Sequence, residues 1–133
     1  MVRLEIAAIY AGVNILLLLA LAVRVAGGRR RGKIVLGDGD ADFLRVQRAH
    51  GNAAEYIPAG IAGLTLIALL EPAAPLWLLH AAGASLTGGR ILHAVGLAMG
   101  PLNAGRVLGI TLTWLAFLLI GGGLIYAGAA QQI

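Results

Sequence analysis

Four long apolar stretches fill most of this sequence, and they restrict the chain to helices in a membrane. They cover about residues 4–26, 42–70, 73–99 and 104–129. A helix needs about 20 predominantly apolar residues to cross the hydrocarbon core of a bilayer, and each stretch is long enough. Only 12% of the residues are charged, whereas a soluble domain has about 25%. The sequence therefore predicts an integral membrane protein in contact with the lipid bilayer.

Short connections between the stretches predict how the helices are arranged. Proline and glycine end helices, and they occur in the links at 71–73 (EPA) and 100–103 (GPLN). Such short links make consecutive helices antiparallel neighbours. The expected fold is therefore all-α, with one domain over residues 1–133 that forms a four-helix membrane bundle.

The one long link, at 27–42, predicts the orientation of the bundle. Its basic residues are Arg29, Arg30, Arg31 and Lys33. A basic run beside apolar segments is typical of a cytoplasmic flank, and we prefer this interpretation to a nucleic-acid site, so no nucleic-acid partner is expected. Counting spans from this link, the turn at 100–103 is also cytoplasmic, while both termini and 71–73 face outward.

The sequence predicts no metal site. It has no cysteine, which excludes a thiolate nucleophile and a zinc–thiolate centre. Asp38, Asp40 and Asp42 alternate like the first ligands of a calcium loop, but Ala49 stands where such a loop needs a glutamate. The preferred interpretation is a glycine-rich turn in which Asp42 caps the second helix and complements its dipole.

The second apolar stretch begins with a polar segment, RVQRAHGNAAEYIP at 45–58. Each residue turns a helix by about 100°, which puts five polar side chains on one face while His50 points the opposite way. The five are Arg45, Arg48, Asn52, Glu55 and Tyr56. Charges within a bilayer are costly and face a bundle interior, a partner or a water-filled cavity.

Two interpretations of this polar face stay open from the residues alone. In the first, Arg45, Arg48 and Glu55 neutralise one another in an internal ion-pair network. In the second, the face binds a ligand, because two arginines and one glutamate leave a positive excess. Arginine suits carboxylates, and a single glutamate suits an amino group. The second interpretation predicts a site for a zwitterion with more than one carboxylate.

Further cationic and titratable residues are expected in the same layer. Arg90 and His93 lie three positions apart in the third stretch, and Arg106 opens the fourth. The expected topology puts all three toward the cytoplasmic half, together with the arginines of the second stretch. Helix packing alone does not explain such a convergence of positive charge. His80, near the outer end, is expected to be structural or interfacial.

This combination resembles the MAPEG family, the membrane-associated proteins in eicosanoid and glutathione metabolism, and is closest to its short bacterial branch. The segment 45–58 is similar to the family's second-helix signature, an arginine pair followed by Asn, then Glu and an aromatic–Pro end. The four spans, the basic first loop, Arg90 with His93, and Arg106 also match in order and spacing. The resemblance thus covers nearly the whole chain.

The resemblance implies a homotrimer of four-helix bundles in which glutathione, the co-substrate, binds between neighbouring subunits. Gly96 and Gly100, and again Gly105 and Gly109, have the spacing that lets membrane helices approach closely. This spacing also favours association of subunits.

The resemblance also implies a role for each polar residue. The residues that would hold the glutathione peptide are Arg48, Asn52, Glu55 and Tyr56. Arg45 and Arg90 would support the site electrostatically. His93 stands where leukotriene-type members have a ligand-binding tyrosine, and Arg106 matches the arginine proposed to stabilise the thiolate. An arginine of the first helix contributes in the family, and here three residues compete for that role, namely Arg24, Arg29 and Arg30.

Three positions depart from the eicosanoid members. Leu97 replaces a tyrosine, Val107 follows Arg106 where prostaglandin-type members have serine, and Gly51 replaces a residue that is basic in some relatives. These departures argue against a specific eicosanoid substrate and leave open whether the protein catalyses a reaction.

Two classes of function follow. The first is a glutathione-dependent transferase or peroxidase that acts on a lipophilic electrophile, in a bacterial inner membrane. The alternative is a non-catalytic membrane protein that binds an anionic lipid or a thiol in the polar layer. A small transporter is a weaker third interpretation, because the sequence has no inverted repeat and no paired broken helices.

Overall fold

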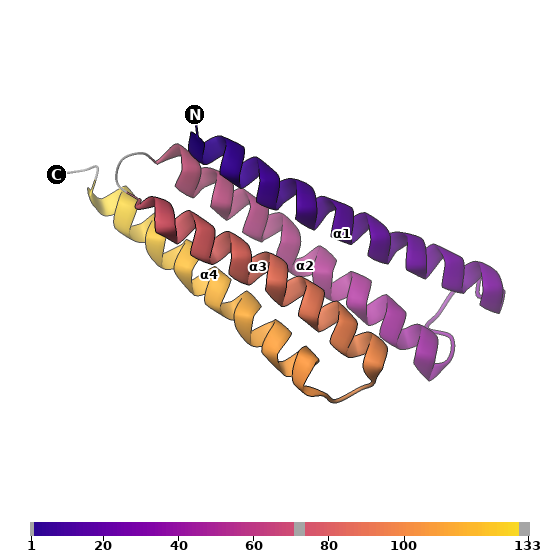
Figure 1. Cartoon of the computed structure of the whole chain (residues 1–133). Helices are drawn as coiled ribbons and strands as arrows, with labels where there is room; N and C mark the ends of the chain where they lie inside the picture. The colour runs from indigo at the N-terminus through magenta and orange to yellow at the C-terminus, as the bar shows by residue number, and fades with distance from the viewer. Residues whose placement is uncertain (1, 71–73, 131–133) are drawn as a thin grey trace.

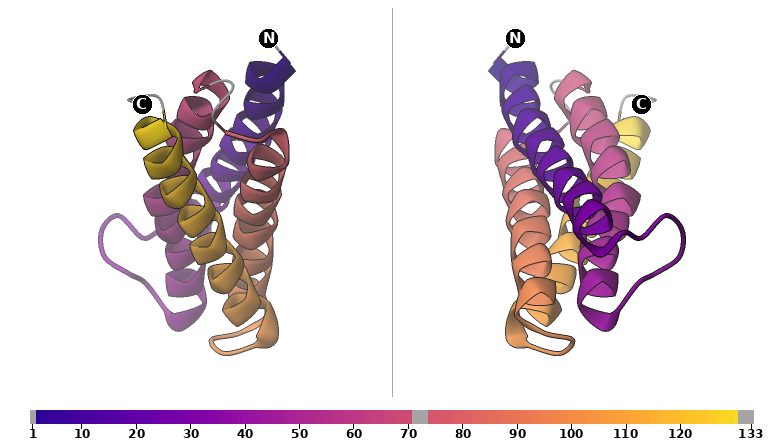
Figure 2. Two further views of the ribbon diagram at one scale, coloured as in Figure 1. Left: turned by 90° about the vertical axis from the view of Figure 1, so that its left-hand side faces the viewer. Right: turned by 90° about the vertical axis from the view of Figure 1, so that its right-hand side faces the viewer.

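The computed structural model describes residues 2–70 and 74–130, and these residues form four helices. The helices are α1 (Val2–Gly32), α2 (Ala41–Leu69), α3 (Leu76–Met99) and α4 (Ala104–Ala130). They pack as an antiparallel bundle (Figure 1, Figure 2). The predicted all-α four-helix fold is confirmed, while the turn predicted at 71–73 lies outside the described residues.

The links and the chain termini are distributed between the two ends of the bundle as the expected topology requires. The link between α1 and α2 and the turn between α3 and α4 lie at one end, and the start of α1 and the end of α4 lie at the other (Figure 1). We call the first of these the basic end, because Arg29, Arg30 and Arg31 occupy the last turn of α1 there. The side of the membrane that each end faces stays a prediction.

Both boundaries of the first link differ from the sequence-based expectation. α1 continues through the basic run to Gly32, because positive side chains are stabilised at the negative C-terminal end of a helix dipole. The link between the helices is therefore shorter than 27–42. At its other end, Asp40 rather than Asp42 caps α2: its carboxylate accepts a hydrogen bond of 2.7 Å from the backbone N–H of Phe43. Asp42 lies in the first turn of α2, where it complements the dipole as expected.

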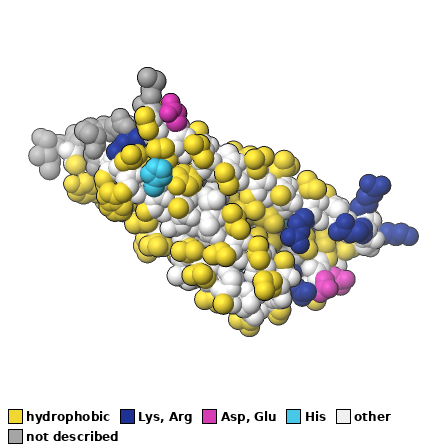
Figure 3. All heavy atoms as spheres, viewed as in Figure 1, with side chains coloured by type: hydrophobic (Ala, Val, Ile, Leu, Met, Phe, Trp, Pro, Cys, Tyr) yellow, Lys and Arg dark blue, Asp and Glu magenta, His cyan; other side chains and the backbone are white. Residues whose placement is uncertain are grey.

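The outer surface of the bundle is apolar along its length. Ile9 and Leu16 of α1, and Leu118 and Ile125 of α4, each expose more than half of their surface. Figure 3 shows hydrophobic side chains along the body of the molecule and most of the visible Lys and Arg at one end. Within residues 2–70 and 74–130, α1, α2 and α4 are long and apolar enough to cross a membrane. The chain is thus a multi-pass membrane protein.

α3 also exposes apolar side chains, but it is not among the three helices that are apolar enough overall. Its 24 residues give a length of about 36 Å at about 1.5 Å per residue, which is enough to cross a hydrocarbon core of about 30 Å. It carries the polar residues Arg90 and His93, which lower its hydropathy although both are buried inside the bundle. Its crossing of the membrane stays a prediction, supported by its antiparallel course along α4 (Figure 1).

Glycines let α3 and α4 approach closely within one chain. A Cβ atom at Gly109 of α4 would overlap the backbone of His93 in α3, and one at Gly96 of α3 would overlap the backbone of Arg106 in α4. The small-residue spacing therefore serves the contact between these two helices. It does not support the expected association of subunits.

The close approach of α3 and α4 predicts a specific sensitivity to added volume. Gly109→Ala should lower the free energy of unfolding by about 1–3 kcal/mol, because the new methyl meets backbone that has no room to move. The matched control is Gly122→Ala, an exposed position in the same helix with no atom within 4 Å of the added methyl. That change should be neutral or slightly stabilising, because alanine favours a helix over glycine. Thermal unfolding in detergent, followed by circular dichroism, measures both. Equal melting temperatures for the two variants would contradict the packing described.

Candidate functional site

A cavity of about 440 Å³ lies between α2, α3 and α4 at the basic end of the bundle. We call it the central cavity. Among the polar residues singled out from the sequence, those that line it are Arg45, Arg48, Asn52, Glu55, His93 and Arg106. Leu97 and Gly51, two of the positions that depart from eicosanoid members, line it as well. The structure thus brings together residues from three helices that span more than 60 positions of the sequence.

Arg90 lies behind the lining of the central cavity and is fully buried, with 1% of its surface exposed. Its Nε and Nη2 atoms donate to the hydroxyl of Thr113 at 2.9 and 2.6 Å. Its Nη1 atom donates to the side-chain oxygen of Asn52 at 2.6 Å. The Thr113 hydroxyl in turn donates to the carbonyl of Gly109 at 2.9 Å. One guanidinium therefore ties α2, α3 and α4 together.

The contact with Arg90 fixes how Asn52 faces the cavity. Its side-chain oxygen is turned to the guanidinium, so its NH₂ group is turned away from Arg90. That NH₂ group makes no hydrogen bond within the described part of the chain, while Asn52 lines the cavity. An amide NH₂ is a donor only. Asn52 therefore offers the cavity a donor suited to a carbonyl or carboxylate oxygen.

Tyr56 does not line the central cavity, although it shares the predicted face of α2. The Arg90 guanidinium lies over its ring, 4.9 Å from the centroid. The ring also packs edge-on against Phe117, with centroids 5.5 Å apart, and its hydroxyl accepts a hydrogen bond of 3.4 Å from Trp114. Tyr56 supports Arg90 in this single chain, and its direct contact with a ligand stays a prediction.

The internal ion-pair network considered for the polar face is not formed. Arg45 pairs with Asp42 at 2.6 Å rather than with Glu55. In the described ranges 2–70 and 74–130, Glu55 and Arg48 make no ion pair, and both are exposed. The cavity lining thus has three arginines, with Arg106 as the third, and one glutamate. With Arg45 paired to Asp42, the positive excess that is available to a ligand comes from Arg48 and Arg106 against Glu55.

Arg106 is held in place by the turn before α4. Its backbone N–H donates to the side-chain oxygen of Asn103 at 3.0 Å, which is an N-cap interaction. The Asn103 amide group also donates to the carbonyls of Gly96 and Gly100, at 2.6 and 3.2 Å, so the cap is tied to α3. The Arg106 guanidinium donates to the carbonyl of Pro101 through Nη1. A guanidinium has five N–H donors, so others are left for the cavity.

Several residues of the site were missed from the sequence. Thr113 and Trp114 lie in the apolar α4 with no polar stripe to mark them, and their roles depend on α2 and α3. Asn103 had a signal, since an Asn three residues before Arg106 at a helix start is typical of an N-cap. Outside the site, Asn14 was also missed. It is fully buried in α1 and donates to the Thr87 hydroxyl at 2.7 Å, and this hydrogen bond joins α1 to α3.

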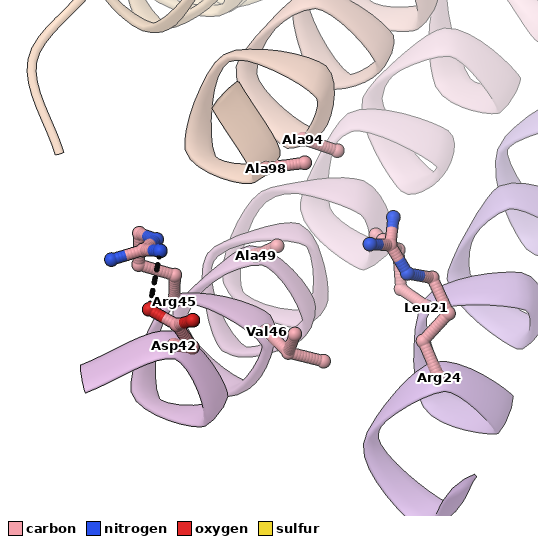
Figure 4. A pocket seen from close by; sticks show the side chains of 8 residues that line it. All are labelled: Leu21, Arg24, Asp42, Arg45, Val46, Ala49, Ala94 and Ala98. Atoms are coloured by element: carbon pink, nitrogen blue, oxygen red, sulfur yellow. Dashed lines mark hydrogen bonds and ion pairs between the residues drawn. The ribbon is translucent and has the colours of Figure 1, made fainter. Parts of the chain in front are cut away.

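None of the three competing arginines of α1 reaches the central cavity of its own chain. Arg29 donates to the side-chain oxygen of Gln47 at 3.0 Å and lies over the ring of Phe43. Arg30 is exposed. Arg24 lines a second cavity, between α1, α2 and α3 (Figure 4). Which of them serves a site between subunits stays open.

His80, which lies away from the basic end, makes structural contacts, as expected. The Tyr10 hydroxyl lies 3.2 Å from the Nδ1 atom of His80 and donates to its carbonyl at 3.4 Å. This pair joins α1 to α3 near the opposite end of the bundle.

Comparisons with known proteins support the family resemblance found in the sequence. The family model described as "MAPEG family" matches residues 7–126. Among curated proteins, the chain is similar to "Inner membrane protein YecN" of Escherichia coli strain K12, with 34% identity over 116 residues, 86% of each chain. The protein of that name from Escherichia coli O6:H1 strain CFT073 matches to the same extent.

The burial of Arg90 predicts that lysine cannot replace it. Arg90→Lys should lower the free energy of unfolding by about 1–3 kcal/mol, because the ammonium cannot reach the Thr113 and Asn52 oxygens together and leaves one buried acceptor unsatisfied. The control is Arg31→Lys in the exposed last turn of α1, which should change stability little. Thermal unfolding in detergent compares them, and a wild-type melting temperature for Arg90→Lys would refute the bridging role.

Proposed function

Because the chain belongs to the MAPEG family, we propose that it binds glutathione in the central cavity and uses it in a transferase or peroxidase reaction on lipophilic electrophiles. The observation that carries this proposal is the charge of the cavity lining, with Arg45, Arg48 and Arg106 against a single carboxylate, Glu55. Glutathione has two carboxylates, one ammonium group and a thiol. Its net negative charge is complementary to the net positive charge of the cavity lining.

The proposed contacts follow from the groups that face the cavity. The arginines of α2 bind the glutathione carboxylates, because a guanidinium matches a carboxylate with two parallel hydrogen bonds. Glu55, which has no ion pair with the described residues, binds the ammonium group. The Asn52 NH₂ group donates to a peptide carbonyl. Arg90 touches no ligand in this account and holds Asn52 in orientation.

The proposed chemistry needs only position and charge from the protein. A free thiol has a pKa of about 8.5, and a nearby cation lowers the pKa of a thiol. Arg106 supplies that cation at the start of α4. The thiolate then forms a sulfur–carbon bond with the electrophile as the leaving group departs with its electron pair. The exposed apolar side chains of Val107 and Leu108 next to Arg106 suit a substrate that arrives from the bilayer.

The assembly and the membrane are proposed from the family and from the relative. We place the protein in a bacterial inner membrane, as the name of the relative says for that protein. A homotrimer, as the MAPEG resemblance implies, would bring an α1 arginine of a neighbouring copy to the cavity. The apolar outer surfaces of α1 and α4 are available for lipid and for such contacts.

A test of the binding proposal uses Glu55→Gln. Glutathione affinity should fall by about 1 kcal/mol, because the ammonium group loses its charged partner and a pair at an exposed carboxylate contributes about that much. The melting temperature should stay close to that of the wild type, since Glu55 is exposed and makes no ion pair in the described part of the chain. Isothermal titration in detergent measures the affinity. The matched control is Glu5→Gln, an exposed glutamate at the far end of α1, which should bind glutathione normally.

The opposite pattern would favour a different account of Glu55. If Glu55→Gln keeps its glutathione affinity and melts at a lower temperature, Glu55 balances the arginines of the fold and does not bind the ligand.

A test of the catalytic proposal uses Arg106→Ala. Glutathione binding should be largely retained, because other residues hold the peptide. Turnover of a generic aromatic electrophile should fall by about 10²–10³, which is typical when a charge aimed at the reacting atom is removed. The thiolate is followed by its ultraviolet absorbance in a pH titration of the complex, and its pKa should rise toward that of free glutathione.

The same titration distinguishes an enzyme from a binding protein. A wild-type complex without a lowered thiol pKa, or an Arg106→Ala variant that keeps the lowered pKa, would remove Arg106 from catalysis. Binding of glutathione without turnover of any electrophile would favour the alternative, a non-catalytic membrane protein that binds a thiol or an anionic lipid.

A further inference from the structure

A second cavity, of about 210 Å³, lies between α1, α2 and α3. Its charged residues are Arg24 of α1 and the pair Asp42 and Arg45 at the start of α2. The rest of its lining is apolar, with Leu21, Val46 and alanines of α2 and α3. We call it the α1 cavity.

Arg24 is the unexplained group of the α1 cavity. Figure 4 shows its side chain reaching from α1 toward the space between α2 and α3. It makes no hydrogen bond or ion pair with any residue in 2–70 or 74–130. The one acid of the cavity, Asp42, is paired with Arg45 at 2.6 Å on the far side of it. The positive charge of Arg24 is therefore not balanced by an acidic residue of the cavity lining.

Arg24 is exposed at the surface of the bundle, where an unpartnered charge facing the membrane is costly. It lies eight residues before the end of α1, which is about 12 Å along the helix axis. A bilayer leaflet changes from headgroups to hydrocarbon over such a distance, and an arginine there either extends its side chain toward the interface or meets an anion. The guanidinium points into a cavity between helices, where a second molecule has room to meet it.

The shape and lining of the α1 cavity fit one occupant in particular. A phosphate would meet the Arg24 guanidinium with two parallel hydrogen bonds. The apolar wall made by Leu21, Val46 and Ala94 suits the first methylenes of an acyl chain. Basic pockets between membrane helices are typical sites for anionic lipid headgroups. The exposed arginines in the last turn of α1 would attract such lipids to this end.

We propose that the α1 cavity binds the headgroup of an anionic phospholipid through Arg24, with the start of an acyl chain along the small side chains of α2 and α3. This cavity is distinct from the central cavity of the same chain, and the proposal does not depend on glutathione binding. The two cavities share one wall residue, Arg45.

Native mass spectrometry of the detergent-purified protein tests the proposal. The protein is titrated with dioleoyl phosphatidylglycerol and, separately, with dioleoyl phosphatidylcholine, which has the same chains and no net charge. The phosphatidylglycerol should bind more tightly. Arg24→Gln should weaken its binding about fivefold, the effect of one basic residue on an anionic lipid. The control Arg31→Gln, at an exposed arginine outside the cavity, should weaken it far less.

A second pair of variants tests the cavity without removing a charge. Ala98→Leu adds volume at an exposed position of the cavity lining and should also weaken phosphatidylglycerol binding. Ala20→Leu, on the exposed surface of α1 outside the cavity, should leave it unchanged. These two variants test whether phosphatidylglycerol binds in the α1 cavity even if Arg24→Gln fails to fold.

Three results would overturn the proposal. Equal affinity for the two lipids would remove the phosphate as the recognised group. Equal losses in Arg24→Gln and Arg31→Gln would make the basic end a general attractor of anions with no built site. If Arg24→Gln weakens glutathione binding and spares phosphatidylglycerol, Arg24 serves the glutathione site of a neighbouring copy instead.

Discussion

The buried guanidinium of Arg90 is the interaction on which the rest of the site depends. Taking a cation out of water costs several kcal/mol even after the protein relaxes. Hydrogen bonds to a charged group return about 1.5–3 kcal/mol each, and a desolvated cation over an aromatic ring about 2 kcal/mol. Arg90 has both kinds of partner, in Thr113, Asn52 and the ring of Tyr56. Its burial is therefore tolerated only where three helices meet in this arrangement.

The glycines of α3 and α4 bring the partners of Arg90 within reach. Added Cβ atoms at Gly89 and Gly109 would overlap the facing helix, so larger residues there would move Thr113 away from the guanidinium. The same close approach puts His93 and Arg106 on one wall of the central cavity. The arrangement of the proposed ligand groups thus follows from backbone contacts as well as from charge.

Much of the fold was predictable because the membrane leaves few choices. Long apolar stretches with short links permit little except an antiparallel bundle, and the 3.6-residue period of α2 correctly gathered Arg45, Arg48, Asn52 and Glu55. The same period put Tyr56 on that face, but its ring lies under Arg90, a contact with another helix that no helical projection contains. The pair of Arg45 with Asp42 and the cap by Asp40 were likewise decided by local geometry at the start of α2. The α1 cavity could not be predicted, because it depends on how three helices are spaced.

Recognition of glutathione by the central cavity is tested by comparing it with cysteinylglycine, which has the same thiol and the same C-terminal glycine but lacks the γ-glutamyl group. Isothermal titration of the wild-type protein with each ligand separates recognition of the whole zwitterion from simple attraction of a thiol to a basic site. If the arginines of α2 and Glu55 recognise the γ-glutamyl group, glutathione should bind and cysteinylglycine should bind much more weakly. Equal affinities, or no detectable heat with glutathione, would contradict the account.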